Sequence, residues 1–227
     1  MLEIKNVSVQ FSDESDVQAV EDVSLTVAEG QKIALVGETG SGKSVLLLAI
    51  LRLLPETAIV KGQVLYKGED LLSLKKKQLN KIRGAEISYV PQGGGGSMNP
   101  LLKVGFQVGE PLMEHKGFTK KQAVQRSVEL LKMFRLGNEE QLVHAYEPSK
   151  GLDEKRVSLV VEAFEQLKEE SLLCVTHDMM FAGRISDHIC VLYAAQQVEY
   201  GPTEEILKNP LHPYTQDMIL AIPENGM

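Results

Sequence analysis

The chain of 227 residues has little of several features that define protein classes. It has only two cysteines, Cys174 and Cys190, which lie inside apolar runs and lack the spacing of metal ligands. They are typical of reduced core thiols in an intracellular protein. The longest apolar run, "SVLLLAILRLLP" at 44–55, is interrupted by Arg52 and is too short to cross a bilayer. We therefore expect no direct membrane span.

Positive charge is also scarce, since the formal net charge is −7. An acidic chain is a poor partner for phosphate backbones, which argues against nucleic acid as the main partner. The first residues, "MLEIKNVSVQF", alternate like a strand and lack the charged-then-apolar pattern of a signal peptide. We expect a cytoplasmic chain unless a partner holds it at a membrane.

What the chain has in quantity is apolar sequence, at 43% of its residues, which is enough to bury a sizeable core. Alternating or continuous apolar patterns predict strands at 2–11, 17–27, 31–37, 62–68, 86–92, 171–178, 188–193 and 196–201. Helical spacing and caps predict helices at 43–54, 70–83, 119–134 and 154–170, with more helix on both sides of a Pro-rich turn in the tail. Together these patterns favour an α/β fold with an antiparallel addition.

The segment "GETGSGKS" at 37–44 matches the phosphate-binding P-loop pattern, and it follows a predicted strand and opens a predicted helix. Glycines let successive backbone N–H groups converge on phosphate oxygens at a helix N-terminus. Lys43 should neutralise the phosphates, and the Ser44 hydroxyl should bind Mg²⁺. The predicted nucleotide-binding residues here are Gly37, Glu38, Thr39, Gly40, Ser41, Gly42, Lys43 and Ser44.

A P-loop by itself does not choose among GTPases, kinases and transport ATPases. A GTPase would carry an Asn-Lys-x-Asp motif that reads the base, and the one Asn-Lys pair, in "NKIR" at 80–83, does not match it.

Further segments resemble an ABC-type ATPase of the branch that serves peptide and nickel importers, along nearly the whole chain. They are "AVEDVSLTVAEGQKIALVGETGSGKS", "ISYVPQ", "MNPLLKVGFQVGEPL", "EPSKGLD", "LLCVTHD" and "NPLHPYT". The resemblance implies an α/β P-loop NTPase core with an antiparallel β subdomain and a truncated helical subdomain. It places the ATPase core at about 1–92 and 147–227, and the remnant of the helical subdomain at about 93–146.

The resemblance also implies roles for single residues. Phe11 would stack on adenine, although its residue context equally fits a core position at a strand end. Gln92 would reach Mg²⁺ or the attacking water, and Glu147 would act as general base. Asp153 would belong to the nucleotide-binding D-loop, and His177 would contact the γ-phosphate and the water. The other histidines are expected to be structural or on the surface: His115, His144, His188 and His212.

Two elements that this family needs are absent between Tyr146 and Glu147. One is the "LSGGQ"-like signature motif, and the other is the Walker B strand that ends in a magnesium-binding Asp. The sequence "HAYEPSKGLD" at 144–153 reads as two half-motifs joined, with Tyr146 in the position of that Asp. Catalytic competence of the chain as printed is therefore open.

Three explanations compete for this gap. The printed chain omits residues of the natural protein, or the gene carries a true deletion, or "QLVHAYE" at 141–147 is a degenerate Walker B strand. Removing a central strand would leave buried N–H and C=O groups without partners, at a cost of about 1–3 kcal/mol each. Since total stability is only about 5–15 kcal/mol, omission is the explanation that we favour.

The resemblance implies an ATP- and Mg²⁺-dependent subunit that energises a membrane importer for peptides, nickel or a similar small solute. Its partners would be a second ATPase subunit, the same or homologous, and integral-membrane permease subunits at the inner face of the cell membrane. Two alternatives remain: a soluble ABC-type ATPase of an enzyme complex such as carbon–phosphorus lyase, or a hydrolysis-deficient nucleotide-binding paralogue. Association with a membrane fraction would separate the first two, and nucleotide titration with intact mass would identify the third.

Overall fold

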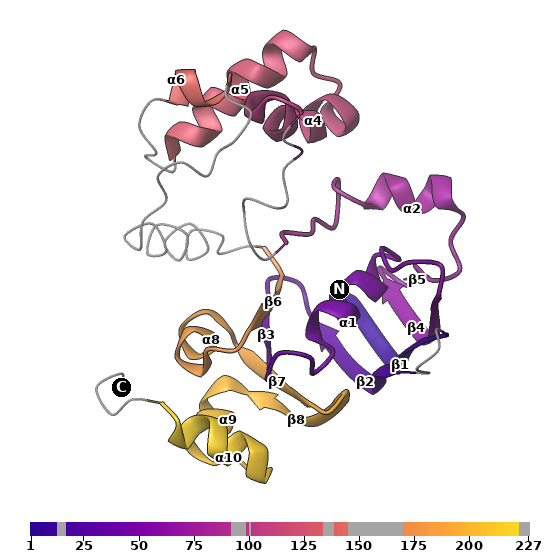
Figure 1. The fold of residues 1–227 in the computed structure, drawn as a ribbon, viewed down its shortest axis with the longest axis vertical. Coiled ribbons are helices and arrows are strands. Elements are labelled where there is room, and N and C mark those ends of the chain that lie inside the picture. The colour runs from indigo at the N-terminus through magenta and orange to yellow at the C-terminus, as the bar shows by residue number, and fades with distance from the viewer. Residues whose placement is uncertain (13–16, 92–98, 100, 134–138, 145–169, 223–227) are drawn as a thin grey trace. The chain divides into compact units, whose positions relative to one another are not determined.

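The computed structural model describes residues 1–12, 17–91, 99, 101–133, 139–144 and 170–222. The chain divides into two units, Met1–Leu74 with Leu167–Met227, and Lys75–Gln166. All of the described strands belong to the first unit (Figure 1).

The described strands of the first unit form one eight-stranded sheet, in the order β5-β4-β1-β2-β8-β7-β3-β6. They are β1 (Leu2–Phe11), β2 (Gln18–Val27), β3 (Lys32–Val36), β4 (Ala58–Tyr66), β5 (Glu69–Asp70), β6 (Leu172–Thr176), β7 (His188–Tyr193) and β8 (Gln196–Pro202). Strand β1 pairs antiparallel with β2 and β4, whereas β3 lies parallel to β6 and β7. This mixture confirms the predicted α/β core with an antiparallel addition.

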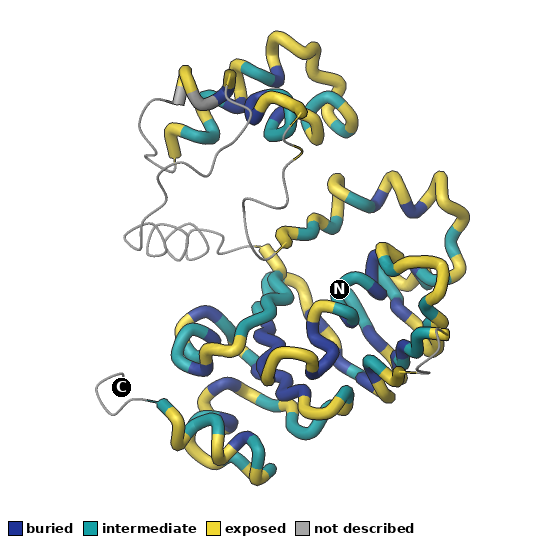
Figure 2. Tube along the Cα trace, in the orientation of Figure 1, coloured by how far each residue is buried: buried dark blue, intermediate teal, exposed yellow. Residues whose placement is uncertain are grey.

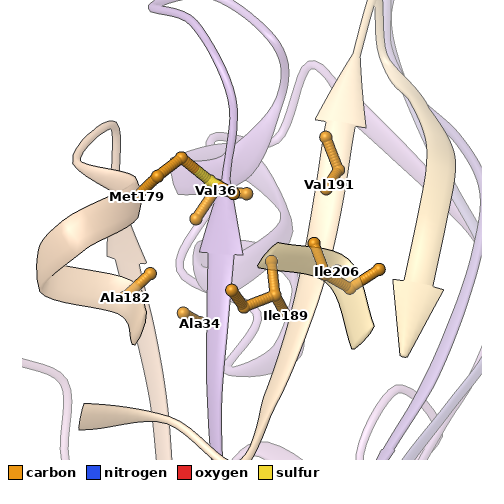
Figure 3. Close-up of a cluster of buried hydrophobic side chains, with 7 residues drawn as sticks. All are labelled: Ala34, Val36, Met179, Ala182, Ile189, Val191 and Ile206. Atoms are coloured by element: carbon orange, nitrogen blue, oxygen red, sulfur yellow. The ribbon is translucent and has the colours of Figure 1, made fainter. Parts of the chain in front are cut away.

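A buried apolar cluster joins strands β3 and β7 to the helices of the tail. These helices are α8 (Met179–Ile185), α9 (Thr203–Lys208) and α10 (Pro213–Leu220). Figure 3 shows side chains of β3 and β7 facing those of α8 and α9: Ala34, Val36, Met179, Ala182, Ile189, Val191 and Ile206. Partly buried residues of α9, α10 and β8, Tyr214 among them, pack against this cluster. The tail is therefore anchored to the strand that leads into the P-loop.

Helix α1 (Lys43–Ile50) starts where the sequence predicts but ends before the expected Leu54. The backbone turns into the left-handed region at Arg52, with φ of 50°, and Leu53 N–H donates to the Leu48 carbonyl over 2.8 Å. The Arg52 guanidinium donates to the Leu74 carbonyl over 2.6 Å. This turn ends the helix before Pro55 can.

Strand β6 is one of the two edge strands of the sheet among the described residues, and β5 is the other. All five residues of β6 are half-buried, whereas Ile33, Ala34, Leu35 and Val36 of the neighbouring β3 are fully buried (Figure 2). An apolar parallel strand is ordinarily covered on both sides, so this exposed edge is unusual for its composition.

The strand predicted at 86–92 was wrong for the residues that the structure describes. Its only ladder contact there is an isolated bridge between Arg83 and Ile87. A strand exists only where a neighbour completes its hydrogen bonds, and no described strand runs beside residues 86–91. The apolar pattern was real, but no partner for pairing is present in the described structure.

The second unit is helical where it is described, with α2 (Lys76–Ile82), α4 (Val104–Lys116), α5 (Lys120–Met133) and α6 (Glu139–Leu142). Helix α5 confirms the predicted helix at 119–134. Its start is a capping box, in which Thr119 N–H donates to Gln122 Oε1 over 2.9 Å and Gln122 N–H donates to Thr119 Oγ1 over 3.4 Å. Helix α4 packs on α5 through a hydrogen bond of 2.9 Å from Ser127 Oγ to the Gly105 carbonyl.

Residues 141–144 do not form the degenerate Walker B strand considered above. Gln141 and Leu142 end α6, and Val143 and His144 form a turn. The Val143 carbonyl accepts a hydrogen bond of 3.0 Å from Gly105 N–H at the start of α4, which ties this turn to a helix rather than to a sheet. Of the three explanations for the gap, omission and true deletion remain. Residues 154–169 of the helix predicted at 154–170 lie outside the described residues, and Glu170 forms a bend.

Candidate functional site

The predicted phosphate loop lies between β3 and α1, at the carboxyl end of a strand that is paired on both sides. A tight turn, with Ser41 N–H donating to the Glu38 carbonyl over 3.2 Å, leads into the helix. The Leu46 N–H in the first turn of the helix donates to the Gly42 carbonyl over 2.9 Å. Gly37, Ser41, Gly42 and Lys43 are buried, while Glu38, Thr39, Gly40 and Ser44 are exposed. The base of the loop is thus buried and its tip is exposed to solvent.

Two of its glycines are required because other backbone segments approach closely. A β-carbon on Gly37, where φ is 148°, would lie 2.1 Å from the Leu192 carbonyl oxygen at the end of β7. A β-carbon on Gly42, where φ is 95°, would lie 2.3 Å from the Ala19 carbonyl oxygen of β2. Neither contact leaves room for any side chain, so the base of the loop is wedged between two strands of the sheet.

The Lys43 ammonium folds back onto the loop that carries it. Its Nζ donates to the Gly37 carbonyl over 2.7 Å and to the Ser41 hydroxyl over 3.1 Å, and it also contacts the Glu38 carbonyl. Lys43 is only 8% exposed. Burial lowers its pKa, and the nearby Glu38 charge opposes part of that shift. A desolvated cation held by neutral carbonyls is electrostatically suited to receive an anion at the loop.

The metal-binding prediction rests on Ser44 and Gln92. Ser44 is the second residue of α1 and is exposed, so its hydroxyl is free of burial and offers a hard oxygen of the kind that Mg²⁺ prefers. The described residues include no cluster of three His, Cys, Asp or Glu side chains that could hold a metal ion. In phosphate sites Mg²⁺ is commonly held by one or two protein oxygens together with oxygens of the nucleotide.

His177 follows directly after β6, and β6 lies parallel to β3, so both elements end at the same edge of the sheet. Its side chain is exposed. The next residue, Asp178, caps α8 by accepting from Met180 N–H over 2.8 Å and Phe181 N–H over 3.0 Å. Thr176 Oγ1 accepts from Asp178 N–H over 3.0 Å. His177 thus lies in a short corner between β6 and α8 that the hydrogen bonds of Asp178 fix.

Phe11 ends β1, where it pairs with Ala58, and it is half-buried. Stacking of its ring on adenine stays a prediction. Gln92, Glu147 and Asp153 lie outside the described residues, so the structure does not place them. The structure therefore brings together the P-loop and the His177 strand, and it leaves the other predicted groups to experiment.

The structure adds two residues that sequence patterns did not single out, Tyr214 and Glu199. The Tyr214 hydroxyl accepts a hydrogen bond of 2.9 Å from the P-loop amide of Glu38, across 176 positions of sequence. The Glu199 carboxylate accepts from Leu211 N–H over 2.8 Å and His212 N–H over 3.1 Å, immediately before α10. The segment "NPLHPYT" supported the family resemblance, but nothing in its local sequence indicates the hydrogen bond between Tyr214 and the P-loop.

Family comparison places these features in context. The profile described as "ABC transporter" matches residues 20–169, and the one described as "Oligopeptide/dipeptide transporter, C-terminal region" matches residues 198–227. The second match contains both Glu199 and Tyr214.

Curated relatives match over almost the entire chain. A dipeptide transport ATP-binding protein of Lactococcus lactis is 34% identical, with 98% of this chain and 74% of the relative covered. One from Haemophilus influenzae is 33% identical, covering 99% of this chain and 78% of the relative. An oligopeptide transport ATP-binding protein of Bacillus subtilis is 31% identical, covering 98% and 72%.

Solved structures agree on the fold. A bacterial ABC transporter cassette solved as a dimer superposes with a TM-score of 0.74 at 23% identity, covering 89% of this chain and 99% of that one. The same cassette in a post-hydrolysis state bound to ADP and phosphate superposes with a TM-score of 0.75 at 24% identity, with the same coverage.

The alignments also bear on the gap. Each of the three relatives aligns over 257 positions, which exceeds the 227 residues of this chain by 30. The relatives therefore carry at least 30 residues inside the matched region that this chain lacks. From its P-loop geometry, its sheet order and these matches, the chain belongs to the ABC transporter family of ATP-binding proteins.

Proposed function

We propose that the natural protein is the ATP-binding and ATP-hydrolysing subunit of a membrane importer for peptides. The observation that carries this proposal is the P-loop. Its buried Lys43 ammonium donates to the Gly37 carbonyl and the Ser41 hydroxyl, and the exposed tip of the loop lies next to a helix N-terminus. The names of the relatives support peptides as the solute rather than nickel.

The work of the described residues follows from their chemistry. The loop amides bind the phosphates of ATP, and Lys43 exchanges its carbonyl partners for phosphate oxygens, which removes the cost of its burial. The Ser44 hydroxyl would contribute one ligand to Mg²⁺, and the bound metal would neutralise charge on the phosphates. His177 supplies a hydrogen bond to the γ-phosphate from the neighbouring strand. Gln92, Glu147, Phe11 and Asp153 keep the roles that the family resemblance implies.

The partners we propose are a second ATPase subunit, identical or homologous, and integral-membrane permease subunits at the inner face of the cell membrane. In the described part of the chain, no helix has the length and apolarity required to cross a bilayer. Binding of ATP by two such subunits would close them together, and hydrolysis would reopen them. Nucleotide binding would in this way shift the equilibrium between the open and closed pair. A soluble ATPase of an enzyme complex is a second candidate, but no feature of the described residues favours it.

We further propose that the 227 residues as printed bind nucleotide weakly and do not turn it over, because a strand and a signature helix are missing between Tyr146 and Glu147. Three observations support this. The relatives carry at least 30 additional internal residues, β6 has an uncovered apolar edge among the described strands, and residues 86–91 have no described strand beside them. The loss of a strand next to β6 would account for its uncovered edge.

The test uses two proteins: the 227-residue chain, verified by intact mass, and the natural coding sequence across Tyr146–Glu147. Each is titrated with ATP, beside its Lys43→Ala variant as a matched control, and assayed for phosphate release. We expect binding by both proteins, loss of binding in both variants, and turnover only by the natural protein. Binding unaffected by Lys43→Ala would overturn the proposed site. Turnover by a preparation with the mass of the 227 residues would refute the proposed gap.

A further inference from the structure

One peptide unit of the P-loop, between Gly37 and Glu38, has partners at both of its ends. Its carbonyl, on Gly37, accepts from Lys43 Nζ over 2.7 Å. Its N–H, on Glu38, donates to the Tyr214 hydroxyl over 2.9 Å. Because a trans peptide is planar, its C=O and N–H point in opposite directions, and the chain contains no cis bond among the described residues. Tyr214 therefore sets the orientation of the carbonyl that holds Lys43.

Tyr214 is itself held firmly enough to act in this way. Its ring lies 4.4 Å, centroid to centroid, from the ring of Tyr193 at the end of β7. Its own N–H donates to His212 Nδ1 over 3.2 Å, and His212 N–H in turn donates to Glu199. Pro213 occupies the first turn of α10, where its fixed φ favours the helix. The tyrosine is thus located by a strand, a turn and a helix together.

The same strand end also confines the preceding P-loop residue. Leu192, next to Tyr193, presents the carbonyl that leaves no room for a side chain on Gly37. The first two residues of the P-loop therefore lie between the end of β7 and the start of α10. Burial raises the pKa of Tyr214. The hydrogen bond from the Glu38 amide lowers this pKa to a smaller extent, and the charges of Glu38 and Tyr193 raise it, so the hydroxyl stays protonated and neutral at physiological pH.

We propose that Tyr214 is a positioning residue of the nucleotide site, which orients the Gly37–Glu38 peptide and through it the Lys43 ammonium. It does not touch the phosphates in this arrangement. The Glu38 amide donates to Tyr214 and the Ser41 amide donates to the Glu38 carbonyl, so the anion would be bound by other amides of the loop. This inference rests on the proposed function, since it concerns the affinity of the same P-loop for nucleotide.

The test compares Tyr214→Phe with Tyr193→Phe in the ¹⁵N-labelled 227-residue chain. Both variants keep the two neighbouring rings, and each removes one hydroxyl, but only the first removes the acceptor for Glu38. ADP is titrated into each protein and followed at the loop amides by NMR, which measures weak affinities. Exchange of the Glu38 amide with solvent and the melting temperature of the free protein are measured on the same samples.

We expect Tyr214→Phe to weaken ADP binding by about three- to tenfold, because that factor corresponds to the net contribution of one hydrogen bond. The variant should also accelerate exchange of the Glu38 amide with solvent. Tyr193→Phe should change the affinity by less than about twofold on the same scale. Unchanged affinity in Tyr214→Phe, with or without a lower melting temperature, overturns the inference while leaving the proposed function standing. Failure of the unmodified chain to bind ADP overturns both the inference and the proposal that the 227 residues bind nucleotide.

Discussion

The Cα of Gly37 lies so close to the carbonyl of Leu192 that a β-carbon there would stand 2.1 Å from the carbonyl oxygen. The contact joins the last residue but one of β7 to the first residue of the P-loop. The conformation of the base of the phosphate site therefore depends on how closely the strands pack, because the Leu192 carbonyl is a backbone group and cannot rotate away from a side chain on Gly37.

Replacing Gly37 by Ala should therefore destabilise the fold and disable the loop. Gly40→Ala is a matched control, because Gly40 also has positive φ, at 87°, yet its β-carbon would meet nothing within 4 Å. The control should cost about 1–2 kcal/mol of backbone strain, and Gly37→Ala should cost more. Urea unfolding measures both, and equal losses would show that the clash with Leu192 is relieved by a small shift.

Glu199 should contribute stability that depends on pH. Partial burial acts to raise its pKa, but the hydrogen bonds it accepts, led by that of Leu211, and the charge of His212 lower the pKa overall. A carboxyl with a lowered pKa stabilises the fold above its unfolded-state pKa, and that stabilisation is lost as pH falls through the folded-state pKa.

The Glu199→Gln variant should then be less stable than the parent by about 1 kcal/mol at pH 7, with the difference shrinking below about pH 4. Urea unfolding at several pH values measures this. Glu56→Gln, at an exposed position, is the control for general loss of charge. A difference that is constant with pH would assign the effect to shape rather than to ionisation.

Asp178 should stabilise the corner that holds His177. Its carboxylate accepts from two amides at the start of α8. Asp178→Ala removes both acceptors and should cost about 1 kcal/mol, while Asp178→Asn keeps an acceptor and should cost less. Thermal unfolding measures the order of the variants. If Asn proves as damaging as Ala, the negative charge rather than the hydrogen bonds supports the corner.

Both cysteines should resist alkylation in the folded chain. Burial raises the pKa of the Cys190 thiol to about 12, and it also raises the pKa of the half-buried Cys174. Only the thiolate reacts, so iodoacetamide at pH 8 should leave Cys190 unmodified and modify Cys174 slowly. Mass spectrometry after labelling, with a urea-denatured control in which both react, checks this. Rapid labelling of Cys190 would mean that β7 opens.

Local sequence was a good guide wherever an element depends on its own residues and caps. The P-loop motif, its flanking strand and helix, the helix that follows Thr119 and the strands β7 and β8 were all predicted, because period, turn residues and caps act within a few positions. The family was also predicted from short motifs, the P-loop among them.

What the sequence could not decide depends on neighbours far along the chain. The apolar stretch at 86–91 is no strand in the described structure because no described strand lies beside it, and the end of α1 was set by a turn at Arg52. The motifs identified the phosphate loop by themselves. Only the tertiary structure could bring Tyr214 to the Glu38 amide, because a hydrogen bond across 176 positions depends on how β7 and α10 pack against β3.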